Sequence, residues 1–132
     1  MIKGRCECAR VAYQVDGELV DFSHCHCSKC RKLHGAAFAT WGGVHRAEFT
    51  YTSGENEVNE YAFSDNSGSV FCRHCGSRIL VDSRADADML YIAMGTVDGE
   101  VTCPKGFHEY VGSKASWYEI SDDLPQYNKS SD

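Results

Sequence analysis

The sequence predicts a mainly β protein of antiparallel strands, folded as one domain over residues 1–132. Short stretches rich in β-branched and aromatic residues run along most of the chain, and turn signals such as Asp16-Gly17 separate them. Only one short segment has helical character, and no internal repeat or Pro/Gly-rich linker divides the chain. Many short strands with frequent turns are typical of antiparallel all-β folds.

Six segments are expected to form strands, because they combine β-forming residues with partial alternation of apolar and polar side chains: 11–15, 37–41, 48–52, 60–63, 78–81 and 90–94. Turns are expected between strands at 16–17, 42–43, 53–54, 65–68 and 98–99. The expected helix runs from Ser28 to Leu33, with Ser28 as its N-cap. We expect an ordered core over residues 3–124 and a tail over 125–132, whose polar end at 128–132 frays.

Composition and charge exclude several classes of protein. Apolar residues make up 42% and charged residues 24% of the chain, as in ordinary globular proteins. The net charge of −6 argues against a general affinity for nucleic acids. No apolar run approaches the roughly 18 residues that span a bilayer, and Met1–Arg5 leads into cysteines without a signal-peptide core. We therefore expect a soluble, cytoplasmic protein without a nucleic-acid or membrane partner; the sequence gives no oligomeric state.

Eight cysteines are the most informative feature of the sequence. Seven of them form three clusters, CxC at 6–8, CxCxxC at 25–30 and CxxC at 72–75, while Cys103 stands alone. In a reducing cytosol, clustered thiols are more often metal ligands or redox groups than disulfides. The clustering favours zinc, bound as two ions that share seven ligands as four plus three.

The first ligand set combines the CxC and CxxC clusters. In an extended strand both sulfurs of CxC point to one face, and two more ligands are needed to complete a tetrahedron. CxxC followed by glycine resembles a zinc knuckle and supplies that second pair. Four thiolates make a closed, structural site with the ligands Cys6, Cys8, Cys72 and Cys75. The alternative is a set of buried thiols without metal, since free cysteine packs well in cores.

The second ligand set comes from one short segment. An extended CxC followed by a helical turn brings Cys25, Cys27 and Cys30 to one point and leaves the fourth tetrahedral position open. Catalytic zinc sites typically have three protein ligands and an open position. In one alternative Cys103 supplies the fourth thiolate and makes the site structural. In another the three cysteines form a thiol redox centre.

No histidine is assigned as a ligand. His24 and His26 alternate with Cys25 and Cys27, so they point to the opposite face of an extended chain. The other four are expected to pack or to lie at the surface: His34, His45, His74 and His108. Of these, His34 would face the second site if the helix continues beyond Cys30.

The motifs together resemble the glutathione-dependent formaldehyde-activating enzyme family, and the resemblance extends from about Lys3 to Leu124. The segments that carry it are Arg5-Cys6-Glu7-Cys8, the run from Cys25 to Arg31 with Gly35, Phe71-Cys72-Arg73-His74-Cys75-Gly76, and the tail from Val111 to Ile120. The family implies a Mss4-like β-tent of twisted antiparallel sheets with one or two short helical turns. It also implies a structural zinc on Cys6, Cys8, Cys72 and Cys75, and a catalytic zinc, where substrate binds, on Cys25, Cys27 and Cys30. Cys103 matches no ligand of the family.

The activity implied by the resemblance is the condensation of formaldehyde with glutathione to S-hydroxymethylglutathione, a carbon–sulfur lyase reaction in reverse. The implied partners are a small thiol such as glutathione and a small aldehyde, and no residue is assigned to an organic cofactor. An open zinc on three thiolates suits positioning and thiol binding better than strong polarisation, because the thiolate charge outweighs that of the ion. Arg31 and Lys32 are expected either to meet a carboxylate of the thiol or to form an exposed basic pair. The alternative function is a non-catalytic zinc module that binds a protein or a small thiol.

Overall fold

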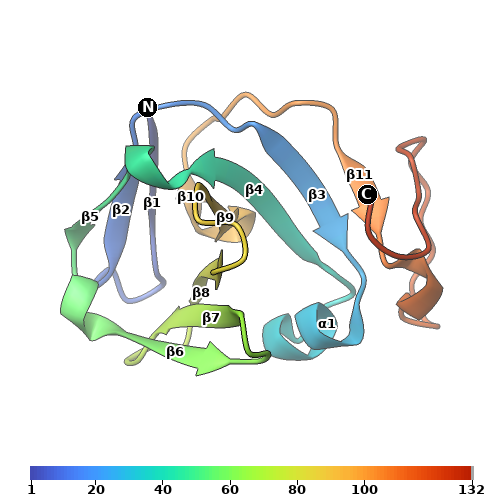
Figure 1. Ribbon diagram of the computed structural model, residues 1–132, viewed down its shortest axis with the longest axis horizontal. Helices are drawn as coiled ribbons and strands as arrows, with labels where there is room; N and C mark the ends of the chain where they lie inside the picture. Colours follow the sequence, from blue (N-terminus) through green and yellow to red (C-terminus); the bar gives the residue numbers. More distant parts are fainter. Residues whose placement is uncertain (132) are drawn as a thin grey trace.

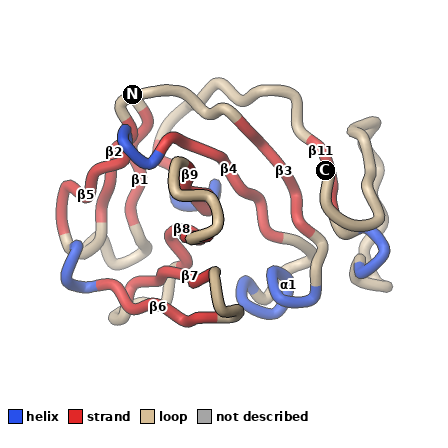
Figure 2. The backbone as a smooth tube through the Cα atoms, in the orientation of Figure 1, coloured by secondary structure: helices blue, strands red, loops and turns tan. Residues whose placement is uncertain are grey.

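The computed structural model describes residues 1–131, and in them eleven strands form two sheets (Figure 1). The prediction of a mainly β, β-tent-like fold is confirmed, and α1 (Ser28–His34) is the one α-helix of this range (Figure 2). The strands are β1 (Ile2–Arg5), β2 (Ala12–Val15), β3 (Asp21–Cys25), β4 (Ala39–His45), β5 (Phe49–Ser53), β6 (Val58–Ala62), β7 (Ser67–Cys72), β8 (Arg78–Ser83), β9 (Met89–Ala93), β10 (Val97–Asp98) and β11 (Phe107–Glu109). Four 3₁₀ turns accompany them, at Arg46–Glu48, Glu55–Glu57, Met94–Thr96 and Val111–Ser113.

The two sheets share one main hydrophobic core. The smaller sheet has the strand order β10-β1-β2-β5, and the larger has the order β11-β3-β4-β9-β8-β7-β6. Ile2 and Tyr13 of the smaller sheet pack with Ile79, Leu80 and Ile92 of the larger one, and all are buried. Burial of side chains from both sheets provides the main stabilisation of such a layered fold.

All six expected strands are present within a few residues of their predicted positions, and β1, β3, β7, β10 and β11 were missed. The missed strands are short or carry polar and small residues, such as SGSVFC in β7. Their pairing depends on neighbours distant in sequence, so local composition gives a weak signal for them.

The turn expected at Gly42-Gly43 is wrong, because both glycines lie inside β4. Gly42 pairs with Ile92 and Gly43 with Tyr91 in the register of β4 and β9. A Cβ at Gly42 would lie 2.6 Å from Met94 Sδ. These glycines therefore allow close packing within a central strand rather than a change of chain direction.

The expected helix is present, but its N-cap is Cys27 and not Ser28. The Cys27 Sγ accepts the backbone N–H of Cys30 at 3.3 Å. The helix ends at Gly35, whose left-handed backbone (φ 60°) is the usual C-terminal stop.

The C-terminal segment packs beside β3 through β11, which runs parallel to β3. Beyond the boundary expected at residue 124, the backbone remains hydrogen-bonded: Tyr127 N donates to His108 O at 2.9 Å and Tyr110 N donates to Lys129 O at 2.9 Å. Residue 132 of the expected frayed end lies outside the described residues. In Figure 1 this segment lies along the outer side of β11.

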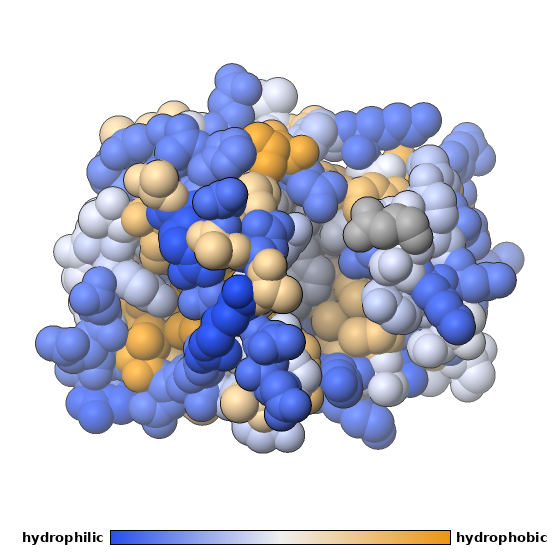
Figure 3. Space-filling view, viewed as in Figure 1, coloured by the Kyte–Doolittle hydropathy of each residue, from blue (hydrophilic) through white to orange (hydrophobic). Residues whose placement is uncertain are grey.

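Polar residues dominate the face seen in Figure 3, and its apolar residues lie in several small areas. Within residues 1–131 no helix is long and apolar enough to cross a membrane.

Candidate metal centres

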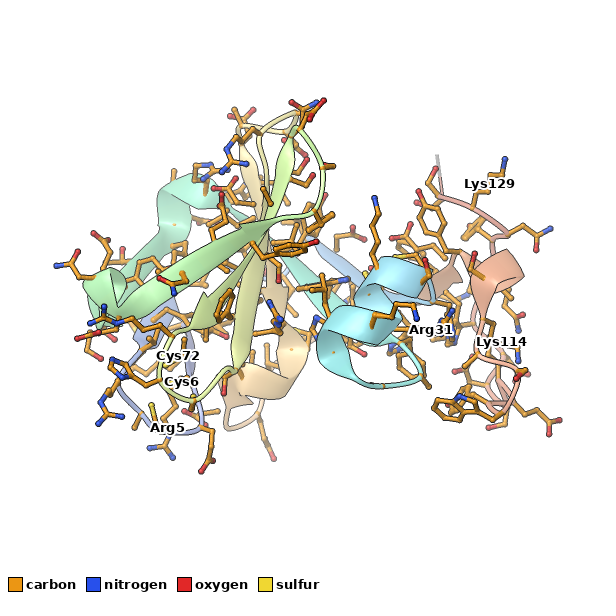
Figure 4. All side chains as sticks on the ribbon, turned by 90° about the horizontal axis from the view of Figure 1, so that it is seen from below. Arg5, Cys6, Arg31, Cys72, Lys114 and Lys129 are labelled. Atoms are coloured by element: carbon orange, nitrogen blue, oxygen red, sulfur yellow. The ribbon has the colours of Figure 1, made fainter. Side chains whose placement is uncertain are left out.

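The first group of cysteines joins the two sheets. Cys6 and Cys8 follow β1, and Cys72 ends β7 with Cys75 in the loop that follows (Figure 4). The expected extended CxC is wrong here, because the segment turns and Ala9 N donates to Cys6 O at 3.1 Å. The turn brings both sulfurs to the CxxC loop, although neither lies in a strand.

The spacing of these four sulfurs fits a tetrahedral metal site. The Sγ atoms of Cys6 and Cys8 are 3.6 Å apart, and those of Cys8 and Cys72 are 3.7 Å apart. All four Sγ atoms lie within 4.8 Å of one another. A tetrahedron with zinc–sulfur bonds of about 2.3 Å has edges of about 3.8 Å. The group therefore has the donor set and the spacing that zinc requires.

Backbone N–H groups donate hydrogen bonds to sulfur atoms of the first group and so favour thiolates over neutral thiols. Val11 N donates to Cys6 Sγ at 3.3 Å, and His74 N donates to Cys72 Sγ at 3.4 Å. The hydrogen bond with Ser77 lowers the pKa of Cys75 to about 5, whereas burial raises the pKa of Cys6 to about 11. Four thiolates at this spacing repel one another, and a divalent cation relieves that repulsion.

The second group consists of Cys25, Cys27 and Cys30, whose Sγ atoms also lie within 4.8 Å of one another. Cys25 ends β3, Cys27 caps α1 and Cys30 lies in the first turn of the helix. Cys25 is buried, and the other two are half-buried. The compact half-shell expected from CxCxxC is therefore present, and it has the donor set for a metal with three protein ligands.

The three thiols of the second group share their protons unequally. The hydrogen bond from Cys25, followed by that from Cys30, lowers the pKa of Cys27 to about 2. The same contact with Cys27 raises the pKa of Cys25 far above its usual range. Negative charge in this group therefore resides first on Cys27.

A cavity of about 310 Å³ lies beside the second group, and Cys30 forms part of its lining. Its other walls combine aromatic and polar side chains, among them Trp41, Phe63, Tyr91, Ser23 and Glu109. Trp41 also packs against the cysteine group together with Ala39 and Ala93. The arrangement provides space for a small molecule directly beside the Cys30 side chain.

Cys103 does not join either group. It is exposed, and its sulfur lies 4.0 Å from Val101 O in the loop after β10. The alternative in which it closes the second site is wrong for this arrangement of the chain, because the second group contains three cysteines without it.

The histidines lie outside both sulfur groups. His26 is fully buried on the side of β3 that also carries His24, and its Nε2 lies 2.8 Å from His108 Nδ1. Burial, followed by the charge of His108, lowers the pKa of His26 to about 4. His34 packs edge-on against Trp41, while His74 pairs with Glu57 at 2.8 Å.

His108 and Asp122 were not singled out as functional residues by sequence reasoning. His108 Nε2 donates to Asp122 Oδ2 at 2.9 Å, and His108 is 1% exposed. No local spacing marks them, because His108 approaches His26 through the pairing of β11 with β3, and Asp122 joins them by its contact with His108.

We compared the chain with known proteins by fold and by sequence. A crystal structure of a Rhodobacter sphaeroides protein superposes with a TM-score of 0.63 at 24% identity, over 74% of this chain and 89% of that one; this likeness shows the fold. No functionally curated protein matched the chain. The profile of the glutathione-dependent formaldehyde-activating enzyme family matches residues 1–113, a range that contains both cysteine groups. The chain belongs to the glutathione-dependent formaldehyde-activating enzyme family.

Proposed function

We propose that this protein is a zinc-dependent enzyme of the carbon–sulfur lyase type, which acts on a thiol adduct of formaldehyde or another small aldehyde. The observation that carries the proposal is the group of Cys25, Cys27 and Cys30 beside a cavity of about 310 Å³. Family membership supports glutathione as the thiol and S-hydroxymethylglutathione as the product. In this assignment the first group of cysteines holds a structural zinc and the second holds a catalytic zinc.

The proposed reaction joins a thiol to an aldehyde. The sulfur forms a bond to the carbonyl carbon, the carbon–oxygen double bond becomes a single bond, and the thiol proton ends on the oxygen. A zinc held by three thiolates supplies a binding position for a thiolate or a carbonyl oxygen. Its net negative surroundings make orientation the larger contribution, because polarisation of the carbonyl is weakened.

The residues of the chain have separate roles in this proposal. Cys25, Cys27 and Cys30 hold the metal, and Trp41 with Phe63 forms an aromatic wall of the cavity beside them. A site that holds the two reactants at bonding distance supplies the main gain available for a bimolecular addition.

Arg31 is suited to meet a carboxylate of glutathione. Its Nε donates to Ser113 O at 3.1 Å, and a guanidinium offers five N–H donors. Figure 4 shows Arg31 extending from α1 towards the C-terminal segment that carries Lys114. Arg31 directly follows Cys30 in α1, so this guanidinium lies next in sequence to the second cysteine group.

The test uses three proteins in parallel: wild type, Cys27→Ala and Cys103→Ala. Zinc is counted by elemental analysis, and exchange between free formaldehyde and its glutathione adduct is followed by NMR above the uncatalysed background. We expect two zinc ions in wild type and Cys103→Ala, and one zinc with background exchange in Cys27→Ala.

Wild type with two zinc ions and background exchange would favour the non-catalytic zinc module. One zinc in wild type, with a reversible disulfide among the second group, would favour the redox centre. Catalytic exchange that survives Cys27→Ala would remove the second group from the mechanism.

A further inference from the structure

Three histidine rings lie behind the second cysteine group, on the face of β3 opposite to Cys25. The ring centroids of His24 and His108 are 4.8 Å apart, and those of His26 and His108 are 5.0 Å apart. His26 and His108 are 0% and 1% exposed. Buried imidazoles require hydrogen-bond partners, so the contacts of these rings show what holds them.

A chain of hydrogen bonds runs from Asp122 through His108 to His26. His108 Nε2 lies 2.9 Å from Asp122 Oδ2 and 3.2 Å from Oδ1, and His108 Nδ1 lies 2.8 Å from His26 Nε2. An ionised carboxylate accepts hydrogen bonds and cannot donate them. With both rings neutral, His108 must therefore carry its proton on Nε2, and His26 must donate from Nε2 to His108.

The bond to His108 is the one hydrogen bond of the His26 ring within the described residues. The Nδ1 atom of His26 is buried and has no hydrogen-bond partner there. The ring is otherwise surrounded by aromatic groups, with Phe38 at 4.9 Å and Tyr118 at 6.4 Å between centroids. The orientation of the ring therefore depends on packing and on the one bond to His108.

The backbone of His26 connects this ring to the cysteine ligands. His26 lies between Cys25 and Cys27, and its N–H donates to Glu109 O at 2.9 Å. His108 and Glu109 are adjacent in β11, which pairs with β3 in parallel. The same strand thus holds His26 by its main chain and by its side chain, immediately behind the two ligands.

We propose that Asp122 is a positioning residue for the Cys25–Cys27–Cys30 site, because it fixes the tautomer and orientation of His26 through His108. The inference rests on the proposed function in one respect, namely that the second group binds zinc. The Asp122 side chain is 46% exposed, so its replacement leaves no buried cavity in the core. Its oxygen also accepts Leu124 N at 3.0 Å, a contact that an asparagine in its place can keep.

The experiment compares Asp122→Asn with Asp123→Asn in the full-length protein. Asp123 is the adjacent carboxylate and is exposed, so its replacement removes the same charge from the same segment. The affinity of the second zinc is measured by competition with a chelating dye, and long-range ¹⁵N–¹H NMR at pH 8 identifies the protonated nitrogen of each histidine. Circular dichroism and retention of the first zinc report folding.

We expect Asp122→Asn to weaken the second zinc by about 10-fold and to remove the preference of His108 and His26 for protonation on Nε2. An amide can donate or accept, so it imposes no tautomer on the ring beside it. Asp123→Asn should match wild type in both measurements. Asp122→Glu keeps an acceptor-only carboxylate and should recover most of the lost affinity and the Nε2 pattern.

Unchanged affinity and unchanged tautomers in Asp122→Asn would overturn the proposal. A Glu variant as weak as the Asn variant would also overturn it, because the effect would then follow the local fold and not the carboxylate. One zinc in wild type would instead refute the proposed metal site, and two zinc ions with no effect of Asp122→Asn would refute the positioning role alone.

Discussion

The Sγ of Cys27 accepts the backbone N–H of Cys30 at 3.3 Å, so one member of the second cysteine group also caps the helix that carries another. The atom that caps the helix is therefore also a proposed ligand of the second metal site. Folding of α1 and assembly of the three sulfurs are coupled, since the turn that brings Cys30 back to Cys27 begins at this hydrogen bond. For this reason the N-cap is Cys27, one residue before the serine that the sequence led us to expect.

Replacement of Cys72 by alanine should unfold the domain. Cys72 is 0% exposed and joins the turn after β1 to the loop after β7, so its loss removes a ligand of the proposed structural zinc and leaves a buried gap. Structural zinc contributes roughly 10–16 kcal/mol of apparent binding free energy in zinc-finger peptides, comparable to the whole stability of a small domain. Circular dichroism melting measures the effect, with Cys103→Ala as the exposed control. A Cys72→Ala protein that melts at the wild-type temperature would show that the first group is not a structural metal site.

Gly54 should tolerate alanine less well than Gly99. Both have left-handed backbone, with φ of 73° and 74°, but a Cβ at Gly54 would lie 2.1 Å from Arg10 O and one at Gly99 would meet nothing within 4 Å. The left-handed conformation costs roughly 1–2 kcal/mol in each variant, and the backbone clash adds about 1–3 kcal/mol at Gly54 alone. Chemical denaturation of the two variants gives the difference. Equal losses of unfolding free energy would mean that the loop at Gly54 shifts freely away from Arg10.

The ion pair of Arg46 and Asp82 should stabilise the fold above the ordinary pKa of aspartate. Arg46 donates to both carboxylate oxygens, at 2.6 and 3.2 Å, and this hydrogen bonding lowers the pKa of Asp82 from 3.8. A lowered folded-state pKa means that the stabilisation is fully present above about 3.8 and is lost as the pH falls through the folded value. The pair is partly exposed, so we expect about 0.5–1 kcal/mol.

The carboxyl ¹³C shift of Asp82 reports this titration directly. Arg46→Gln should move its midpoint upward, whereas Arg5→Gln, which removes the distant partner of Asp98, should leave it in place. If the titration midpoint of Asp82 is the same in Arg46→Gln as in wild type, the assigned cause of the pKa shift is wrong.

Arg31→Gln should weaken the use of glutathione more than that of a neutral thiol. If Arg31 meets a carboxylate of the substrate, its loss raises the KM for glutathione by roughly 10-fold, as expected for a charge-assisted hydrogen bond of about 1.5 kcal/mol. The KM for 2-mercaptoethanol should stay unchanged, and kcat should change little for either thiol. Lys3→Gln on β1 is the control for general loss of positive charge. Equal effects on the two thiols would assign Arg31 to its contact with Ser113 instead.

Much of the second site could be predicted from the sequence. Cys25, Cys27 and Cys30 are close because a strand end and one helical turn bring residues at that spacing together, which local geometry determines. For the same reason the alternation of apolar and polar residues located the strands around Tyr13, Tyr51 and Tyr91. The donor type and the grouping of the cysteines also indicated metal binding without knowledge of the fold.

Only the tertiary structure decided which distant segments meet. The inclusion of Gly42 and Gly43 in a central strand and the approach of His108 to His26 both depend on pairing between strands far apart in the chain. Such contacts depend on burial and on the register of whole sheets. The sequence of one short segment therefore does not indicate which other segment it pairs with. Local chemistry therefore identified the candidate ligands, whereas the packing of β11 against β3 brought His108 beside His26, behind one of the two cysteine groups.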